Sequence, residues 1–134
     1  MNDDNDAILY LAKADESLSG AESELANGRY NNCANRCYYA CFQAAIAALL
    51  RAGIAPSRGR GQWGHDFVQG EFVGILVNRR KLYPAELRDT LALILKVRQA
   101  ADYGRDQVTE TQAIRALRRT HRFVEAIARG GATV

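Results

Sequence analysis

Two charged residues near position 100 are the first candidates for chemistry in this sequence. Arg98 and Asp102 lie four residues apart, at the end of a stretch in which leucine and isoleucine recur every three or four residues. On a helix such residues share one face, so the two side chains can pair. An unpaired arginine on an apolar stripe is costly to desolvate. Two interpretations stay open: a structural ion pair at the end of a bundle, or a site where Arg98, Asp102 and Tyr103 face a cleft or a partner subunit.

Three cysteines form a second group. Cys33, Cys37 and Cys41 follow one another at four-residue steps, which places them on one face of a helix. An odd number with no cysteine elsewhere argues against a disulfide framework. A zinc site commonly takes four ligands from two separate pairs, and no such spacing occurs here. We predict small buried apolar side chains, with no metal and no cofactor; a metal site formed by the three cysteines and His65 is the alternative.

A glycine-rich basic segment precedes the first histidine. Residues 53–64 contain four glycines, Arg58 and Arg60 but no acid, and His65 follows directly. Irregular segments of this length are often functional or disordered. The planar guanidinium suits phosphate, so Arg58 and Arg60 are candidates for binding RNA or a nucleotide. The alternative is a solvated surface in an arginine-rich chain, because 15 of the 18 basic residues are arginine.

Five helices must position these residues. Apolar residues recur at three-, four- and seven-residue steps, which predicts an all-α fold. The predicted helices cover residues 6–27, 31–52, 65–79, 84–104 and 109–129. In the first, the inward positions are predicted to be Ile8, Leu11, Leu18 and Leu25.

The helix predicted over residues 31–52 is apolar nearly all round, so it must be buried on more than one side. A bundle this small offers limited cover for such a helix. This pattern therefore predicts that a homodimer interface supplies the rest.

Composition bounds the class of protein. At 134 residues, 48% of them hydrophobic and 25% charged, the chain fits one globular domain over residues 1–134. The net charge of +3 combines an acidic first 25 residues with a basic remainder. The N-terminus begins with Met1, Asn2 and two aspartates, unlike a secretory signal. The longest apolar run is shorter than the roughly 18 residues of a membrane span. We expect a cytoplasmic protein with no membrane association.

Three segments resemble one family. The string NRCYYACFQAA at residues 35–45 resembles the Arg-x-Tyr-Tyr-Ala-x-Phe-x-Ala-Ala signature of a branch of the HEPN superfamily. His65, followed by Val68 and Phe72, is similar to a second segment of that branch. The string RQAADYG at residues 98–104 resembles its Arg-x-x-Ala-Asp-Tyr ending. The resemblance extends over residues 6–130 and implies an up-and-down four-helix bundle with an additional short helix, usually as a homodimer.

The resemblance also implies a function. Many HEPN proteins are metal-independent ribonucleases, and several are toxins encoded beside a minimal nucleotidyltransferase antitoxin. Their motif is an arginine, four to six intervening residues and then a histidine; here Arg98 matches the arginine, but Tyr103 takes the histidine's place. We expect an RNA-directed toxin–antitoxin or defence protein whose own cleavage is put in doubt by that replacement. The alternative is a non-catalytic module that binds a nucleotide, RNA or a nucleotidyltransferase.

Candidate residues follow from these arguments. The catalytic candidates are Arg98, Asp102, Tyr103 and His65. The candidates for binding RNA or a nucleotide are Arg36, Tyr39, Arg58 and Arg60. Two further Arg…His spacings, at residues 60–65 and 115–121, also fit the motif but lie away from its position in the family, and they arise easily in an arginine-rich chain.

Overall fold

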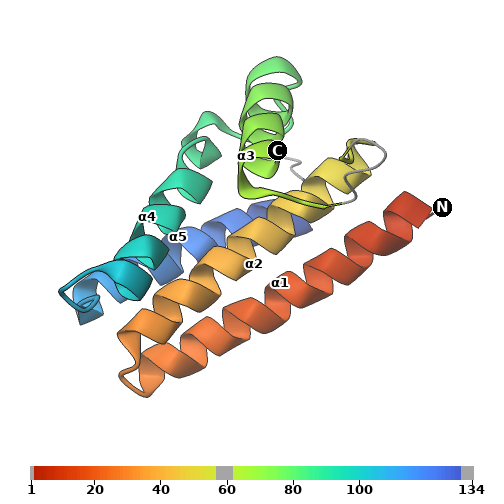
Figure 1. The fold of residues 1–134 in the computed structure, drawn as a ribbon. Coiled ribbons are helices and arrows are strands. Elements are labelled where there is room, and N and C mark those ends of the chain that lie inside the picture. Colours follow the sequence, from red (N-terminus) through yellow and green to blue (C-terminus); the bar gives the residue numbers. More distant parts are fainter. Residues whose placement is uncertain (1, 57–61, 131–134) are drawn as a thin grey trace.

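The fold is an up-and-down bundle of four long helices. A computed structural model describes residues 2–56 and 62–130, and every regular element within them is helical. The long helices are α1 (Asn2–Ala26), α2 (Tyr30–Arg51), α4 (Thr90–Tyr103) and α5 (Glu110–Ala128). Helices α1 and α2 run antiparallel, as do α4 and α5 (Figure 1). The predicted all-α four-helix bundle is confirmed.

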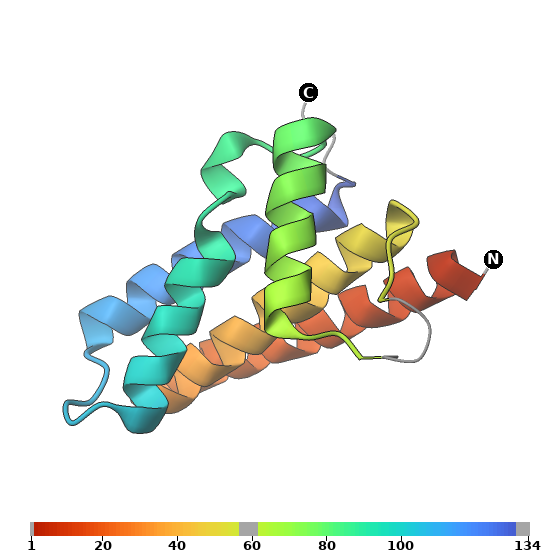
Figure 2. The same ribbon diagram turned by 45° about the horizontal axis from the view of Figure 1, so that its top comes forward.

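The additional short helix lies across the bundle. Helix α3 (His65–Glu71) continues without a break into a π-helical segment, Phe72–Arg79. Together they form one rod that stands against α2 at a steep angle to the bundle helices (Figure 2). The start of this rod places His65 beside the middle of α2, and its other end lies near the connection to α4.

Helix α2 is the centre of the molecule. Helices α1, α4 and α5 all pack against it, and α3 covers part of its remaining surface. Its buried positions are Cys33, Ala34, Cys37, Tyr38, Ala40, Cys41, Ala44, Ala45, Ile46, Ala47, Ala48, Leu49 and Leu50. Most of these side chains are small, which lets the neighbouring helices approach closely. The predicted burial of this helix on several sides is confirmed.

That burial is achieved within one chain. The cover that we assigned to a dimer interface is supplied by the other helices of the same bundle, so this argument for a homodimer was wrong. A bundle of this length supplies enough cover because alanine and cysteine side chains on α2 need little surrounding volume. The homodimer itself stays a prediction.

Helix α1 packs through a narrower stripe than expected. Ile8 is 66% exposed, although we predicted that it faces inward. Of the other predicted positions, Leu18 is buried, and Leu11 and Leu25 are partly buried against the core. The remaining buried residues of α1 are Ala7, Ala14, Ser17 and Ala21. Each step along a helix rotates the side chain by about 100°. The small residues of α1 meet the small residues of α2, and Ile8, one position after Ala7, is turned outward.

The boundary before α4 differs from the prediction. Pro84 has an extended backbone and precedes a short 3-10 turn, Ala85–Leu87, whereas the α-helix begins at Thr90. The buried Leu87 side chain anchors that turn, so the chain changes direction before the helix starts. The end of α4 at Gly104 is as predicted, because this glycine returns to an extended conformation.

Helix α5 begins with a capping box at Thr109. The backbone N–H of Gln112 donates to the Thr109 hydroxyl at 3.1 Å, and the Thr109 N–H donates to the Gln112 side-chain oxygen at 2.9 Å. Such reciprocal bonds satisfy helix donors that otherwise lack partners. The arginines of α5 point outward: Arg115, Arg118, Arg119 and Arg122 are all exposed.

Candidate functional site

Arg98 lies where α4 faces two tyrosine rings of α2. The carbon at the centre of its guanidinium is 4.8 Å from the ring centroid of Tyr38 and 5.3 Å from that of Tyr39. Both distances lie within the roughly 6 Å range of a cation–π interaction. The side chain is 27% exposed, so solvent reaches part of it. The arginine is thus held by aromatic faces and remains accessible.

Asp102 is the charged partner of Arg98. The Nε atom of Arg98 lies 3.4 Å from Oδ2 of Asp102, one helical turn further along α4. This Nε is buried, and its N–H finds no hydrogen-bond acceptor among the described residues. The two observations agree if the carboxylate attracts the guanidinium by charge without lying on the N–H axis. The predicted ion pair is present but imperfectly aligned.

Asp102 is also held from α2. The Asn35 side-chain amide donates to its two carboxylate oxygens at 3.3 and 3.4 Å. Arg36 donates to the Asn35 side-chain oxygen at 3.4 Å and lies 5.1 Å from the ring centroid of Tyr39. A second guanidinium therefore lies on the same tyrosine that Arg98 contacts. This edge of the site carries two arginines and one carboxylate.

His65 reaches the same place through Tyr38. The Tyr38 hydroxyl lies 3.0 Å from Nδ1 of His65, and the two ring centroids are 5.8 Å apart. Burial raises the pKa of Tyr38, while the nearby Arg98 acts in the opposite direction. In the tautomer with the ring proton on Nδ1, that N–H donates to the Tyr38 hydroxyl oxygen, which leaves Nε2 of the neutral imidazole able to accept a proton. Tyr38 thus joins the histidine of α3 to the arginine of α4.

Helix periodicity explains how the sequence builds this Arg98 cluster. Its members are Asn35, Arg36, Tyr38, Tyr39, His65, Arg98 and Asp102. The four residues of α2 fall within one and a half helical turns, and the two residues of α4 lie one turn apart. His65 joins them because it is the first residue of α3, directly after Gly64 in an extended conformation.

The structure gathers most of the predicted site residues and leaves out one. Arg36, Tyr39, His65, Arg98 and Asp102, which come from three helices, all belong to the cluster. Tyr103, at the place of the motif's histidine, is 83% exposed and makes none of the recorded contacts to it. Arg58 and Arg60 lie outside the described residues.

Two members of the cluster were missing from the predicted site. Tyr38 and Asn35 both stand in the segment that resembles the family signature, where Tyr38 belongs to the apolar surface of the predicted helix and Asn35 to its polar strip. Tyr38 is indeed buried, with 3% of its surface exposed. The signal that could have revealed it is chemical: its hydroxyl needs a partner once the ring is buried.

The second Arg…His spacing on α5 forms a different contact. Nε2 of His121 lies 3.1 Å from the Glu22 carboxylate of α1, and both side chains are about half exposed. Such an exposed pair fixes neither partner strongly. The interpretation of residues 115–121 as a chance match to the motif is consistent with this placement.

The cysteines behave as core side chains. Cys33, Cys37 and Cys41 are fully buried, and the Cys41 thiol donates to the Thr120 hydroxyl at 3.6 Å. Burial raises the pKa of the Cys41 thiol to about 12. A thiol that stays protonated is a poor nucleophile and a poor metal ligand. Within residues 2–56 and 62–130, no three His, Cys, Asp or Glu side chains gather as a metal site would require.

Comparison with known proteins defines the class. The chain matches the HEPN domain family over residues 7–130 and belongs to that family. It is 28% identical over 117 residues to "Putative toxin MJ0605" of Methanocaldococcus jannaschii, a match that covers 85% of this chain and 80% of that protein. It is 36% identical over 67 residues to "UPF0332 protein PH1297" of Pyrococcus horikoshii, covering 48% of this chain and 47% of that protein.

The membrane prediction has one structural test. In the part of the chain that the structure describes, no helix has both the length and the apolar character needed to cross a bilayer. Helix α2, although buried on several sides, carries polar side chains at Asn32, Asn35, Arg36 and Gln43 along one strip.

Proposed function

We propose that this HEPN protein is an RNA-directed toxin that binds an RNA phosphate at Arg98 and cleaves the strand with His65 as the proton-transfer group. The observation that carries this proposal is the double role of Tyr38, which contacts the guanidinium of Arg98 and the imidazole of His65. His65 can therefore supply the imidazole that position 103 lacks. The name of the Methanocaldococcus jannaschii relative supports the toxin class.

The proposed chemistry needs only groups of the RNA and of this cluster. The partly exposed Arg98 guanidinium would neutralise charge that builds on the phosphate oxygens during attack. Nε2 of His65 would accept the proton of the ribose 2′-hydroxyl while its oxygen attacks the phosphorus. The bond from phosphorus to the 5′ oxygen breaks, and that oxygen takes a proton from water. The products are a 2′,3′-cyclic phosphate and a 5′-hydroxyl.

The two histidines of the chain allow a matched test. Purified wild-type protein is incubated with a panel of structured and single-stranded RNAs in the presence of EDTA. We expect cleavage by the wild type and a rate lower by about 100-fold or more in His65→Gln, the size of a lost general base. His121→Gln is the control, because His121 lies on α5 and pairs with Glu22.

Tyr38→Phe tests the link between the histidine and the arginine. This variant keeps the ring under Arg98 but removes the hydroxyl next to Nδ1 of His65. We expect cleavage to fall by roughly tenfold, equivalent to one hydrogen bond. Wild-type activity in both His65→Gln and Tyr38→Phe would contradict the role assigned to His65.

A second candidate is a module that binds RNA, a nucleotide or a nucleotidyltransferase without cleaving. The exposed Tyr103 at the place of the motif's histidine favours it, as does the engagement of Arg98 by Asp102. The same RNA panel separates the two functions. Binding that depends on Arg98, without cleavage by the wild type, would favour the second candidate. Neither binding nor cleavage would contradict both.

Assembly and location belong to the same proposal. We propose that residues 1–134 form one cytoplasmic domain, that two copies associate, and that a nucleotidyltransferase encoded nearby is the antitoxin. Ile8 and Leu9, both more than half exposed on α1, give a surface that a second copy could cover. Light scattering of the purified protein measures the first association, and a monomer at all concentrations would contradict it. The second association is tested by co-expression with a minimal nucleotidyltransferase encoded beside this chain, and failure of the two proteins to co-purify would contradict it.

A further inference from the structure

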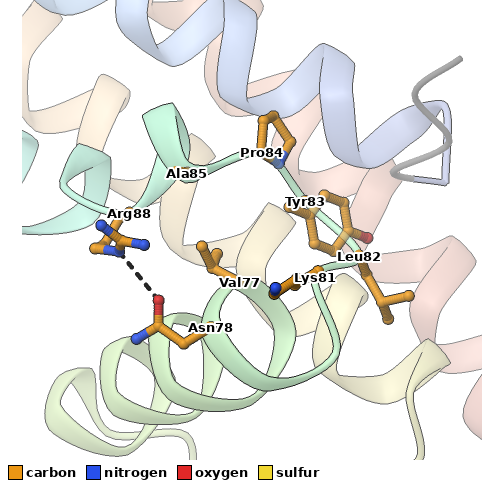
Figure 3. Close-up of a pocket in the computed structure, with 8 residues that line it drawn as sticks. All are labelled: Val77, Asn78, Lys81, Leu82, Tyr83, Pro84, Ala85 and Arg88. Carbon is orange, nitrogen blue, oxygen red and sulfur yellow. Dashed lines mark hydrogen bonds between the residues drawn. The ribbon is translucent and has the colours of Figure 1, made fainter.

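A pocket lies at the end of the α3 rod that is far from His65. Its volume is about 480 Å³, and it opens to solvent between the π-helical segment and the turn that precedes α4 (Figure 3). The lining residues are Val77, Asn78, Lys81, Leu82, Tyr83, Pro84, Ala85 and Arg88. No member of the Arg98 cluster lines it. The 15 residues of the rod separate the two places by roughly 20 Å at 1.5 Å per residue.

The charges of this pocket are all of one sign. Lys81 and Arg88 line it together with no acidic residue. Within the described part of the chain, neither cation forms an ion pair. Arg88 is oriented by a hydrogen bond in which its Nε donates to the Asn78 side-chain oxygen at 3.1 Å. One N–H of the guanidinium is thus used for positioning, and its terminal nitrogens are left for an acceptor.

Lys81 is held at the pocket by an uncommon backbone conformation. Its φ of 54° is the only positive value among the non-glycine residues that the structure describes. A side chain in this left-handed region costs about 1–2 kcal/mol relative to ordinary conformations. The conformation ends the π-helical segment, and Figure 3 shows the lysine side chain extending toward Val77, on the side where Asn78 and Arg88 lie.

The rest of the lining is apolar. Val77 and Tyr83 are buried and form a firm floor, while Leu82, Pro84 and Ala85 form the sides. An inorganic anion alone would leave these carbon surfaces in water. Ligand sites combine such apolar walls with a few placed polar groups. The shape and chemistry together suit a compact organic molecule that carries one oxyanion.

From this combination we propose that the pocket between Lys81 and Arg88 is a second ligand site, which binds a small organic phosphate or carboxylate by its oxyanion and apolar body. The two cations contact the oxyanion, and Val77, Tyr83 and Pro84 contact the body. Arginine and lysine both bind such groups through charge-assisted hydrogen bonds. The site is independent of the RNA chemistry proposed at Arg98.

NMR titration of the ¹⁵N-labelled full chain tests this site. The probes are phenyl phosphate, benzoate and inorganic phosphate, each added to on the order of 20 mM, which would nearly saturate a site with a Kd of about 1 mM. We expect saturable shifts of backbone amides within residues 77–88 with at least one of the two organic probes. Inorganic phosphate is expected to bind at least several-fold more weakly, because it lacks the apolar body.

Three variants identify the groups responsible. Lys81→Gly removes the charge and suits the positive φ, so the fold is retained. Arg88→Gln removes the second charge. Each is expected to weaken binding of the organic probe by about tenfold, the loss of one charge-assisted hydrogen bond. The control is Arg79→Gln, since Arg79 is exposed on the same segment but does not line the pocket.

Several results would overturn the proposal. These are no saturation by either organic probe, equal affinity for inorganic phosphate and phenyl phosphate, and unchanged binding in both Lys81→Gly and Arg88→Gln. Arg98→Met is expected to leave the titration unchanged. A failure of the RNA function proposed at Arg98 would therefore not be confused with a failure of this site.

Discussion

Replacing Arg98 by methionine is expected to abolish function while leaving stability nearly unchanged. The variant keeps the apolar stem against the tyrosines and removes the charge. Two cation–π contacts, to Tyr38 and Tyr39, contribute about 0.5–1 kcal/mol each at a partly exposed position. The ion pair with Asp102, with both side chains more than a quarter exposed, contributes about 0.2–1 kcal/mol. The native side chain thus gains about 1–3 kcal/mol.

The buried Nε of Arg98 opposes this gain. It has no hydrogen-bond acceptor among the described residues, and such a buried donor costs about 1–3 kcal/mol. The methionine stem fills most of the same space without that cost. The two ranges coincide, so the net change is expected to be near zero and at most about 2 kcal/mol. Loss of a group that stabilises charge on a phosphate, by contrast, lowers a rate by roughly 100- to 1,000-fold.

The assay pairs unfolding with cleavage. Urea unfolding is followed through the fluorescence of Trp63, the single tryptophan, which lies against Tyr10 and Phe67 and so reports contacts between α1 and α3. RNA cleavage and RNA binding are measured on the same preparations. The control is Arg118→Met, which removes an exposed arginine of α5. We expect it to change neither measurement.

Two results would refute this reasoning. A loss of more than about 3 kcal/mol in the free energy of unfolding would mean that Arg98 is chiefly a structural residue, because that is the size of breaking a buried charge pair. Cleavage and binding at the wild-type level in a folded Arg98→Met variant would mean that the guanidinium has no part in RNA recognition. Either result would mean that Arg98 is not a functional residue of the site.

Two further predictions concern the core. Phe123→Ala is expected to lower the free energy of unfolding by about 3–5 kcal/mol in urea titrations, because this fully buried ring packs 5.1 Å from that of Phe72; an effect below 1 kcal/mol would contradict its place in the core. Stability is also expected to fall as the pH rises above about 9, because burial raises the pKa of Cys41 from 9.0 to about 12. Between pH 9 and about 12 the unfolded chain releases the Cys41 thiol proton while the folded chain keeps it. The free energy of unfolding therefore falls by up to about 1.4 kcal/mol per pH unit in this range, whereas below pH 9 the contribution of Cys41 is fully present. Cys41→Ala is expected to reduce this slope only in part, because burial also raises the pKa of Tyr38 and Tyr83, and the neighbouring Cys33 thiol together with burial raises the pKa of Cys37. An unchanged slope would contradict the contribution of Cys41.

Periodicity predicted the helices but less reliably which side chains face inward. The stretch with an apolar surface nearly all round became α2 with its expected burial. Ile8 was assigned inward because it lies three residues before Leu11 on the predicted stripe, yet the neighbouring Ala7 is buried instead. Burial of Ala7 rather than Ile8 is set by how closely α1 approaches the small side chains of α2. That distance depends on both helices together. The start of α4 was misplaced for a similar reason, since the burial of Leu87 decides where the chain turns.

What the sequence alone determined is the fold class and the residues of α2 and α4 that compose most of the site. The sequence placed Arg36 and Tyr39 on one predicted helix and Arg98 and Asp102 on another, because residues three or four apart share a helix face. The tertiary structure decided that Tyr38 joins Arg98 to His65, and that Tyr103 does not join them. Contacts between α2, α3 and α4 depend on how the helices pack across many residues of chain, and no spacing within one helix encodes them.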